Sequence, residues 1–180
     1  MDTDRGRRAA PPTAYRHVGP PVIRAAARDA PPGTPVASAA QLSDRLGRQP
    51  APAGPFTCTV GTDGVLRPAD RRSEHVACAG GGAVPGAGEV EFARAADGGH
   101  RAVEMSNPST GYCPDTACRP AVAAALERAG VRHPGGFTYA AVFRRCPECG
   151  ETSLAREGFF VCVFCESEPP ARWNAGPPIA

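Results

Sequence analysis

The sequence of 180 residues contains no lysine, so arginine supplies all 20 of its basic side chains. Aromatic residues make up only 6%, and the formal net charge is +2. A chain so close to neutral lacks the strongly basic character that is typical of nucleic-acid binding domains. We therefore do not expect nucleic acid to be a partner.

Long apolar runs are also absent. No segment approaches the roughly 18 apolar residues that cross a membrane as a helix. The basic N-terminal residues are not followed by the apolar core of about 7–15 residues that a secretory signal contains. We expect no membrane partner and no export, and hence a cytoplasmic location.

Glycine, proline and cysteine are plentiful by contrast, with 21, 21 and 8 copies. Eight cysteines in a chain without an export signal favour metal binding and free thiols in a reducing compartment over a disulfide framework.

Four of the cysteines form two C-x-x-C pairs near the C-terminus, with a dozen residues between the pairs. This spacing matches four-thiolate zinc sites, because a two-residue gap lets both thiolates of a pair reach one tetrahedral ion. The sequence therefore predicts one structural Zn²⁺ ion. A closed site of this kind leaves no open coordination position for catalysis. The predicted ligands are Cys146, Cys149, Cys162 and Cys165.

The segment around these pairs predicts a zinc ribbon over residues 136–174. Glu157-Gly158 indicates a turn, and Phe159–Val161 has the composition of a strand. A rubredoxin-like iron site is the alternative, since iron also accepts four thiolates. We favour zinc because the second pair lacks the proline and glycine of the first. Arg144 and Arg145 are the only clustered basic residues here, and a solvated face explains them.

The other four cysteines have two interpretations. They are small buried hydrophobic residues, or they form a second metal site whose spacing fits no common template. A catalytic cysteine among them would need a nearby base and an electropositive setting. These residues are Cys58, Cys78, Cys113 and Cys118.

Residues 1–54 are rich in proline, alanine and arginine, and we expect a disordered tail there. Such a composition cannot bury enough apolar surface to offset the entropy of ordering. A short helix over Ala39–Leu46 is the only regular element that this part suggests, and the prediction does not rely on it.

Residues 55–135 predict a small antiparallel sheet with one helix, followed by the ribbon, which makes the fold class α+β. A helix starts near Pro120 and ends at Gly130. A later strand over Phe137–Phe143 leads into the first cysteine pair, and Trp173 packs back onto the fold. Alternating apolar residues indicate strands at 56–60, 65–66, 75–78, 89–92 and 102–105.

The glycine-rich stretch Gly80–Gly88 superficially resembles a phosphate-binding loop. A dinucleotide fingerprint needs a helix after the glycines, inside a βαβ unit. Here the following segment alternates like a strand. We therefore interpret the stretch as a connection packed close to another part of the backbone.

Residues 75–114 resemble a module found in plant IQ-motif calmodulin-binding proteins and in some bacterial effector or toxin-like proteins. The chain departs from this pattern at Gly111, where the module has its second histidine, and at Cys78, where it usually has an aromatic residue. No IQ motif is present, so calmodulin binding is not implied. The residues that carry the resemblance are His75, Gly81-Gly82, Val84, Ala87-Gly88-Glu89, Ser109, Tyr112 and Pro114.

Residues 71–174 also resemble uncharacterised actinobacterial proteins that join this module to a C-terminal zinc ribbon. This second resemblance implies a bacterial protein and an architecture, but no reaction.

His75 and Tyr112 are the polar residues of most interest outside the cysteine pairs. If they converge, with Glu89 or Ser109 nearby, they form an acid/base or ligand-orienting site. The structural interpretation is that His75 is a hydrogen-bonded strand end and Tyr112 a core ring with a tethered hydroxyl.

Three functions follow from these patterns. The leading one is a cytoplasmic, non-catalytic zinc-binding module that recognises a protein or a small ligand. The alternatives are an enzyme that uses His75, Tyr112 and Glu89 on a nucleotide-like substrate, and a nucleic-acid adaptor.

Overall fold

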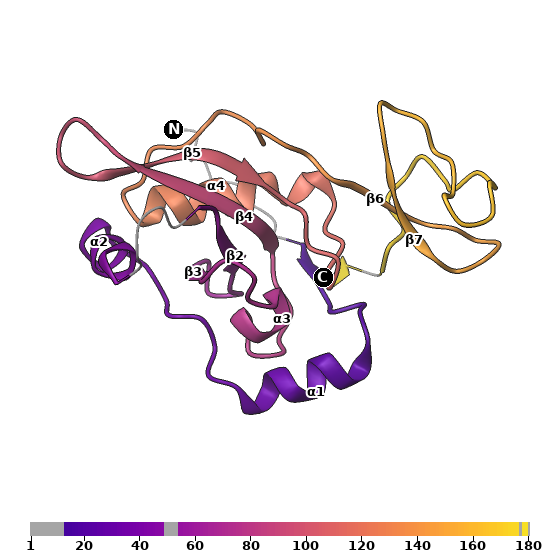
Figure 1. Ribbon diagram of the computed structural model, residues 1–180, viewed down its shortest axis with the longest axis horizontal. Coiled ribbons are helices and arrows are strands. Elements are labelled where there is room, and N and C mark those ends of the chain that lie inside the picture. The colour runs from indigo at the N-terminus through magenta and orange to yellow at the C-terminus, as the bar shows by residue number, and fades with distance from the viewer. Residues whose placement is uncertain (1–12, 49–53, 177, 180) are drawn as a thin grey trace, which may run out of the picture.

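The computed structural model describes residues 13–48, 54–176 and 178–179. Its centre is a four-stranded antiparallel sheet in the order β3-β2-β4-β5 (Figure 1). The strands are β2 (Phe56–Val60), β3 (Leu66–Ala69), β4 (Gly86–Arg94) and β5 (His100–Ser106). The predicted small antiparallel sheet and the mixed helix and strand content are thereby confirmed.

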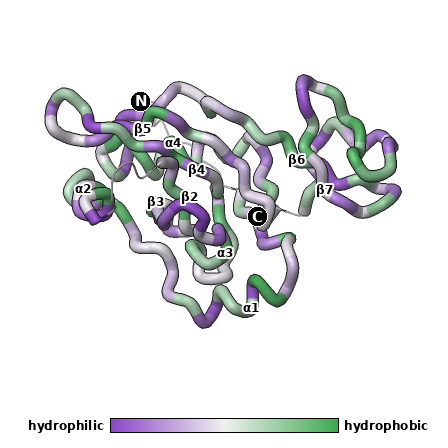
Figure 2. The backbone as a smooth tube through the Cα atoms, in the orientation of Figure 1, coloured by the Kyte–Doolittle hydropathy of each residue, from purple (hydrophilic) through white to green (hydrophobic). Residues whose placement is uncertain are grey.

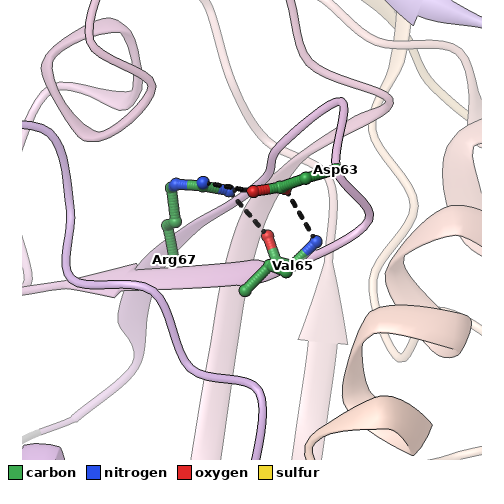
Figure 3. A network of polar contacts seen from close by, with 3 residues as sticks. All are labelled: Asp63, Val65 and Arg67. Atoms are coloured by element: carbon green, nitrogen blue, oxygen red, sulfur yellow. Dashed lines mark hydrogen bonds and ion pairs between the residues drawn. The ribbon is translucent and has the colours of Figure 1, made fainter.

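The turn between β2 and β3 is held by one polar network (Figure 3). Asp63 accepts the Val65 N–H at 3.0 Å and pairs with the Arg67 guanidinium at 2.6 Å. The same guanidinium donates to the Val65 carbonyl at 3.1 Å. Hydrogen bonding from Arg67 lowers the pKa of Asp63 to about 2. A Cβ at Gly61 would lie 2.0 Å from the Arg67 Nη1 atom and 2.4 Å from an Asp63 carboxylate oxygen, so a side chain there would displace this network.

Helix α4 (Arg119–Arg128) packs against β2, β3 and β4 after a single 3-10 turn, η1 (Thr116–Cys118). Pro120 lies in its first turn, and Gly130 follows the helix with a φ of +71°. Both features match the predicted start and stop, because proline suits the first turn and glycine a left-handed C-terminal cap. Leu126 on its apolar face is fully buried.

The prediction of a disordered tail over residues 1–54 is wrong for residues 13–48. This segment contains β1 (Ala14–Tyr15), α1 (Pro21–Asp29) and α2 (Ala39–Gly47). Val36 and Leu42 are 0% exposed and belong to the same hydrophobic core as the sheet. The few apolar residues of the segment are thus enough to order it, because the body offers them a ready surface. Residues 1–12 and 49–53 lie outside the described residues.

The predicted strand over His75–Cys78 is instead a single helical turn, α3 (His75–Cys78). The Cys78 and Ala79 N–H groups donate to the carbonyls of Glu74 and His75 at 3.0 Å each. Four residues are too few to distinguish a period of 2 from a period of 3.6, and this explains the error. The described residues contain four α-helices. The sequence predicted α4 and suggested the helix over Ala39–Leu46, which is present as α2, but it predicted neither α1 nor α3.

The segment predicted as one strand over Phe137–Phe143 is divided in two. Its first part runs beside β5, where the Thr138 N–H donates to the Met105 carbonyl at 2.8 Å. Its second part enters β6 (Val142–Arg145), which pairs only with β7 (Thr152–Ala155). We call residues 142–168 the C-terminal lobe, which lies at one end of the long axis (Figure 1).

The chain after this lobe returns to the body. The Trp173 indole N–H donates to the Cys113 carbonyl at 2.8 Å, and its ring meets Tyr15 edge-on at 5.3 Å between centroids. This confirms the prediction that Trp173 packs back onto the fold. Strand β8 (Pro178–Ile179) then pairs antiparallel with β1. No helix among the described residues is long and apolar enough to cross a membrane.

Candidate metal centre

Four C-terminal thiols come together in the C-terminal lobe and could bind a metal ion. Their sulfur atoms all lie within 4.8 Å of one another, and two pairs of sulfurs are 3.5 Å apart. A tetrahedral zinc ion with bonds of about 2.3 Å needs sulfur–sulfur separations of about 3.8 Å. The four residues predicted as ligands are thus placed where one ion can reach them all: Cys146, Cys149, Cys162 and Cys165.

The first cysteine pair is held in a tight backbone loop. The Cys146 N–H donates to the Glu151 carbonyl at 2.8 Å, and the Gly150 N–H donates to the Cys146 carbonyl at 3.0 Å. Gly150 has a φ of +76°, a left-handed conformation that glycine adopts without strain.

The second cysteine pair has the same loop. The Cys162 N–H donates to the Ser167 carbonyl at 2.8 Å, and the Glu166 N–H donates to the Cys162 carbonyl at 2.9 Å. Glu166 therefore occupies the position that corresponds to Gly150, and it has a φ of +62°. The second pair lacks the glycine of the first, as the sequence shows. It nevertheless has the same hydrogen bonds and the same positive φ.

The residues between the pairs differ partly from expectation. Glu157 and Gly158 both have positive φ, at +52° and +80°, so the predicted turn is confirmed. Phe159–Val161 is not an extended strand, because it forms only an isolated bridge from Phe159 to Arg156.

Ser167 is a component of the site that sequence reasoning missed. Its hydroxyl oxygen lies 2.8 Å from the Cys146 sulfur and 3.1 Å from the Cys165 sulfur. Hydrogen bonding from Ser167 lowers the pKa of both thiols, and that of Cys146 falls to about 6. Such a contact favours the thiolate, which is the form that binds metal.

Arg144 attaches the lobe to the chain that follows it. It is only 8% exposed, and its guanidinium donates to the carbonyls of Phe143, Pro170 and Ala171 at 2.6–3.1 Å. It also lies over the Phe160 ring at 5.2 Å. The prediction of a solvated arginine face is therefore wrong for this residue. The error arose because the local sequence around an arginine does not indicate whether its side chain is buried or exposed.

Two asparagines fasten the lobe and its connection to the body. Asn174 accepts the Arg145 N–H at 2.8 Å and donates to the Arg145 carbonyl at 2.7 Å. Asn107, which is fully buried, makes the equivalent pair of bonds with Ala141 at 2.7 and 2.9 Å. Each side-chain amide thus makes the two hydrogen bonds, one donated and one accepted, that a residue of a neighbouring β-strand would make. Nothing in the sequence around these isolated asparagines indicates this role.

The remaining cysteines do not form a second site within the part of the chain that the structure describes, where the C-terminal four are the only candidate metal group. All of them are buried, and burial raises the pKa of each thiol. They therefore behave as small apolar residues. These are Cys58, Cys78, Cys113 and Cys118.

His75 and Tyr112 hold two ends of the glycine-rich stretch. The His75 Nε2 atom lies 2.9 Å from the Gly88 carbonyl, and the Tyr112 hydroxyl donates to the Gly82 carbonyl at 2.5 Å. Tyr112 is fully buried. Burial lowers the pKa of His75 and raises that of Tyr112 above its ordinary range.

Glu89 and Ser109 occupy different surroundings. Glu89 lies in β4 and acts on His75 only as a nearby charge. Ser109 is fully buried, and its hydroxyl has no hydrogen-bond partner among the described residues. Five cavities between described residues have volumes of about 290 to 550 Å³, and none of these five is lined by His75, Glu89, Ser109 or Tyr112.

The glycine-rich stretch leads directly into a strand, as the sequence indicates. Strand β4 begins at Gly86, so no helix follows the glycines. At Gly88 a Cβ would lie 1.9 Å from the Ser106 carbonyl oxygen, which leaves room only for glycine. The close backbone approach that the sequence suggested is thus present between β4 and β5.

Comparison with known proteins adds no relatives. No family model matches the chain. No curated protein matches it, and no solved structure matches its fold.

Proposed function

We propose that this protein is a binding module stabilised by one structural zinc ion in a C-terminal zinc ribbon. The observation that carries the proposal is the convergence of four thiols, in two C-x-x-C pairs, within 4.8 Å of one another. Sites with four thiolate ligands are closed, so the ion holds the fold and does no chemistry.

Zinc is the proposed metal because four thiolates at this spacing are the usual structural zinc set. Iron is the competing metal, and the shared geometry of the two cysteine loops is compatible with both ions. Metal analysis distinguishes them directly.

The free thiols support a cytoplasmic location. All eight cysteines are unpaired, and a reducing compartment keeps them so. The resemblance to actinobacterial proteins with the same order of modules is part of this proposal, and it concerns architecture only.

A protein or small-molecule partner is favoured over nucleic acid. Arg144 is enclosed by carbonyl groups, so it and Arg145 do not form a paired phosphate-binding surface. The exposed acidic residues of the lobe would repel the extended row of phosphates in a nucleic-acid backbone. They are Glu148, Glu151, Glu157, Glu166 and Glu168.

His75 and Tyr112 have structural roles in this proposal. Each is bonded to a backbone carbonyl of the glycine-rich stretch, which supports a role in shaping that loop rather than in catalysis. No contact within the described residues specifically favours the enzyme alternative.

Metal analysis of the purified protein tests the proposal. We expect about one zinc per chain, lost in the double variant Cys146→Ser/Cys149→Ser together with the order of the lobe. The matched control is Cys113→Ser, which should retain the metal because that thiol lies outside the site. One zinc per chain in the double variant would contradict the ligand assignment, and one iron per chain would contradict the choice of metal.

A further inference from the structure

A cavity of about 550 Å³ lies between the body and the C-terminal lobe. Val18 and Thr110 line it from the body, while Leu154, Val163 and Phe164 line it from the lobe. Its volume lies within the range of about 300–1,000 Å³ that is usual for small-molecule sites. The cavity is the largest of the five compared above.

Part of the apolar wall of this cavity is open to water. Val163 and Phe164 are 73% and 63% exposed, and both belong to the loop between Cys162 and Cys165. Hydrophobic segments recur in the loops of the lobe, away from the central sheet (Figure 2). Large apolar side chains at the mouth of a cavity gain free energy when a ligand covers them.

Arg145 supplies a charged group to the same cavity. Its guanidinium donates to the Ala175 carbonyl at 3.0 Å, which uses only one of five N–H donors. In the part of the chain that the structure describes, no carboxylate forms an ion pair with it. Arg156 and Glu151 also line the cavity, so its charged groups are two arginines and one glutamate.

We propose that this cavity binds a small organic acid, in which an aromatic or aliphatic body lies against Val163, Phe164 and Leu154 and an anionic group pairs with Arg145. A planar guanidinium binds a carboxylate or phosphate through two parallel hydrogen bonds. The proposal rests on the function proposed above, since it identifies the small ligand of the same module.

The charges of the lobe act on this ligand in opposite directions. A divalent ion with four thiolates carries a net charge of −2, which disfavours an anion near the cysteine loops. Arg145, the residue before Cys146, and Arg156 supply positive charge to the cavity that offsets this repulsion. The metal also holds the loop that carries Val163 and Phe164, so an empty metal site should deform the cavity.

Two fluorescent probes of matched shape test the proposal on full-length, metal-loaded protein. The anionic probe is 8-anilinonaphthalene-1-sulfonate, and the neutral control is N-phenyl-1-naphthylamine, which lacks the sulfonate. We expect one molecule of the anionic probe to bind per chain. Arg145→Gln should weaken its binding about tenfold, which corresponds to one charge-assisted hydrogen bond, and should change binding of the neutral probe less than about twofold. Arg145→Lys should recover part of the affinity because it restores the charge.

A second variant tests the cavity without removing the charge. Thr110 is exposed at the rim, so Thr110→Trp should fill the cavity and abolish binding of both probes while metal content stays unchanged. Displacement of the anionic probe by 1-naphthoate or by 1-naphthyl phosphate then distinguishes a carboxylate ligand from a phosphate ligand.

Three results would overturn the proposal: equal effects of Arg145→Gln on the two probes, retained binding in Thr110→Trp, or displacement by neither competitor. Metal content is measured in the same samples. A protein that holds zinc but binds no probe contradicts only this inference, whereas wild-type protein without metal contradicts the function proposed above.

Discussion

Single polar side chains hold the loops of this protein by bonding to main-chain carbonyl groups. His75 and Tyr112 do so at Gly88 and Gly82, and Arg144 does so at the segment after the C-terminal lobe. Loss of such a side chain leaves a buried carbonyl without its donor, which costs more than the bond itself contributes.

His75→Gln and Tyr112→Phe should each destabilise the protein by about 1–3 kcal/mol, because each removes a bond inside the body. Thermal or urea unfolding of the metal-loaded protein measures this. Tyr139→Phe is the matched control, since Tyr139 is 55% exposed and should change stability by less than about 0.5 kcal/mol. If both variants were as stable as wild type or more so, a site around these residues and Glu89 and Ser109 would gain support.

Ser167→Ala should weaken metal binding, because the hydroxyl lies within hydrogen-bond distance of two ligand sulfurs. Loss of a residue that contacts metal ligands typically lowers affinity about 10- to 100-fold. Competition with a chelating dye measures the affinity. Ser153→Ala, in β7 of the same lobe, is the control and should leave the affinity unchanged, because among the described residues the hydroxyl bonded to ligand sulfurs is that of Ser167. Equal affinities in wild type and Ser167→Ala would show that the contact is incidental.

At the scale of the elements, the two cysteine loops share one geometry but differ in the residue that completes it. Gly150 adopts a positive φ freely, whereas Glu166 adopts one at a cost. The second loop therefore holds backbone strain that the first does not.

Glu166→Gly should relieve this strain and stabilise the metal-loaded lobe by up to about 1 kcal/mol. Gly150→Ala should have the opposite effect, of about the same size. Unfolding of the metal-loaded protein measures both. Glu168→Gly is the control, because Glu168 has no positive φ and a glycine there only adds freedom to the unfolded chain. A loss of stability in Glu166→Gly equal to that in the control would refute the strain argument.

The elements differ in how far the sequence predicted them. Helix α4 and strands β2, β4 and β5 were predictable, because their patterns are long enough to show a period and are bounded by proline or glycine. The metal ligands were predictable from spacing alone. Helix α3 was too short to show a period. Three polar residues were not predictable, because they act through contacts with residues distant in the sequence and no local pattern indicates such contacts. They are Ser167, Asn107 and Asn174.

At the scale of the whole molecule, the N-terminal segment is part of the core. Val36 bridges to Leu66 in β3, and Leu42 packs in the main cluster with β2 and α4 residues. Composition alone predicts disorder for this segment, because proline-rich sequence with few aromatic residues usually stays disordered. The segment is ordered because it packs against an apolar surface formed by the rest of the chain. A prediction made from the composition of the segment alone does not include that surface.

Leu42→Ala should therefore destabilise the whole protein by about 2–5 kcal/mol, as expected for a fully buried leucine. Val22→Ala is the matched control within the same N-terminal segment, since Val22 is 73% exposed and its loss should cost less than about 0.5 kcal/mol. Chemical denaturation measures both variants. A Leu42→Ala protein as stable as wild type would instead support the prediction that residues 1–54 are a disordered tail.

The pairing of β1 with β8 has a consequence for the order of folding. It joins residues from nearly opposite ends of the described chain, and Tyr15 also exchanges both backbone hydrogen bonds with Val84. Closing so long a loop is entropically costly until the intervening segments have folded. The central sheet and α4 can assemble first from contacts closer in sequence, and the two-strand closure then forms last. We therefore expect native-state hydrogen exchange to show this two-strand pairing opening at a lower free energy than the central sheet.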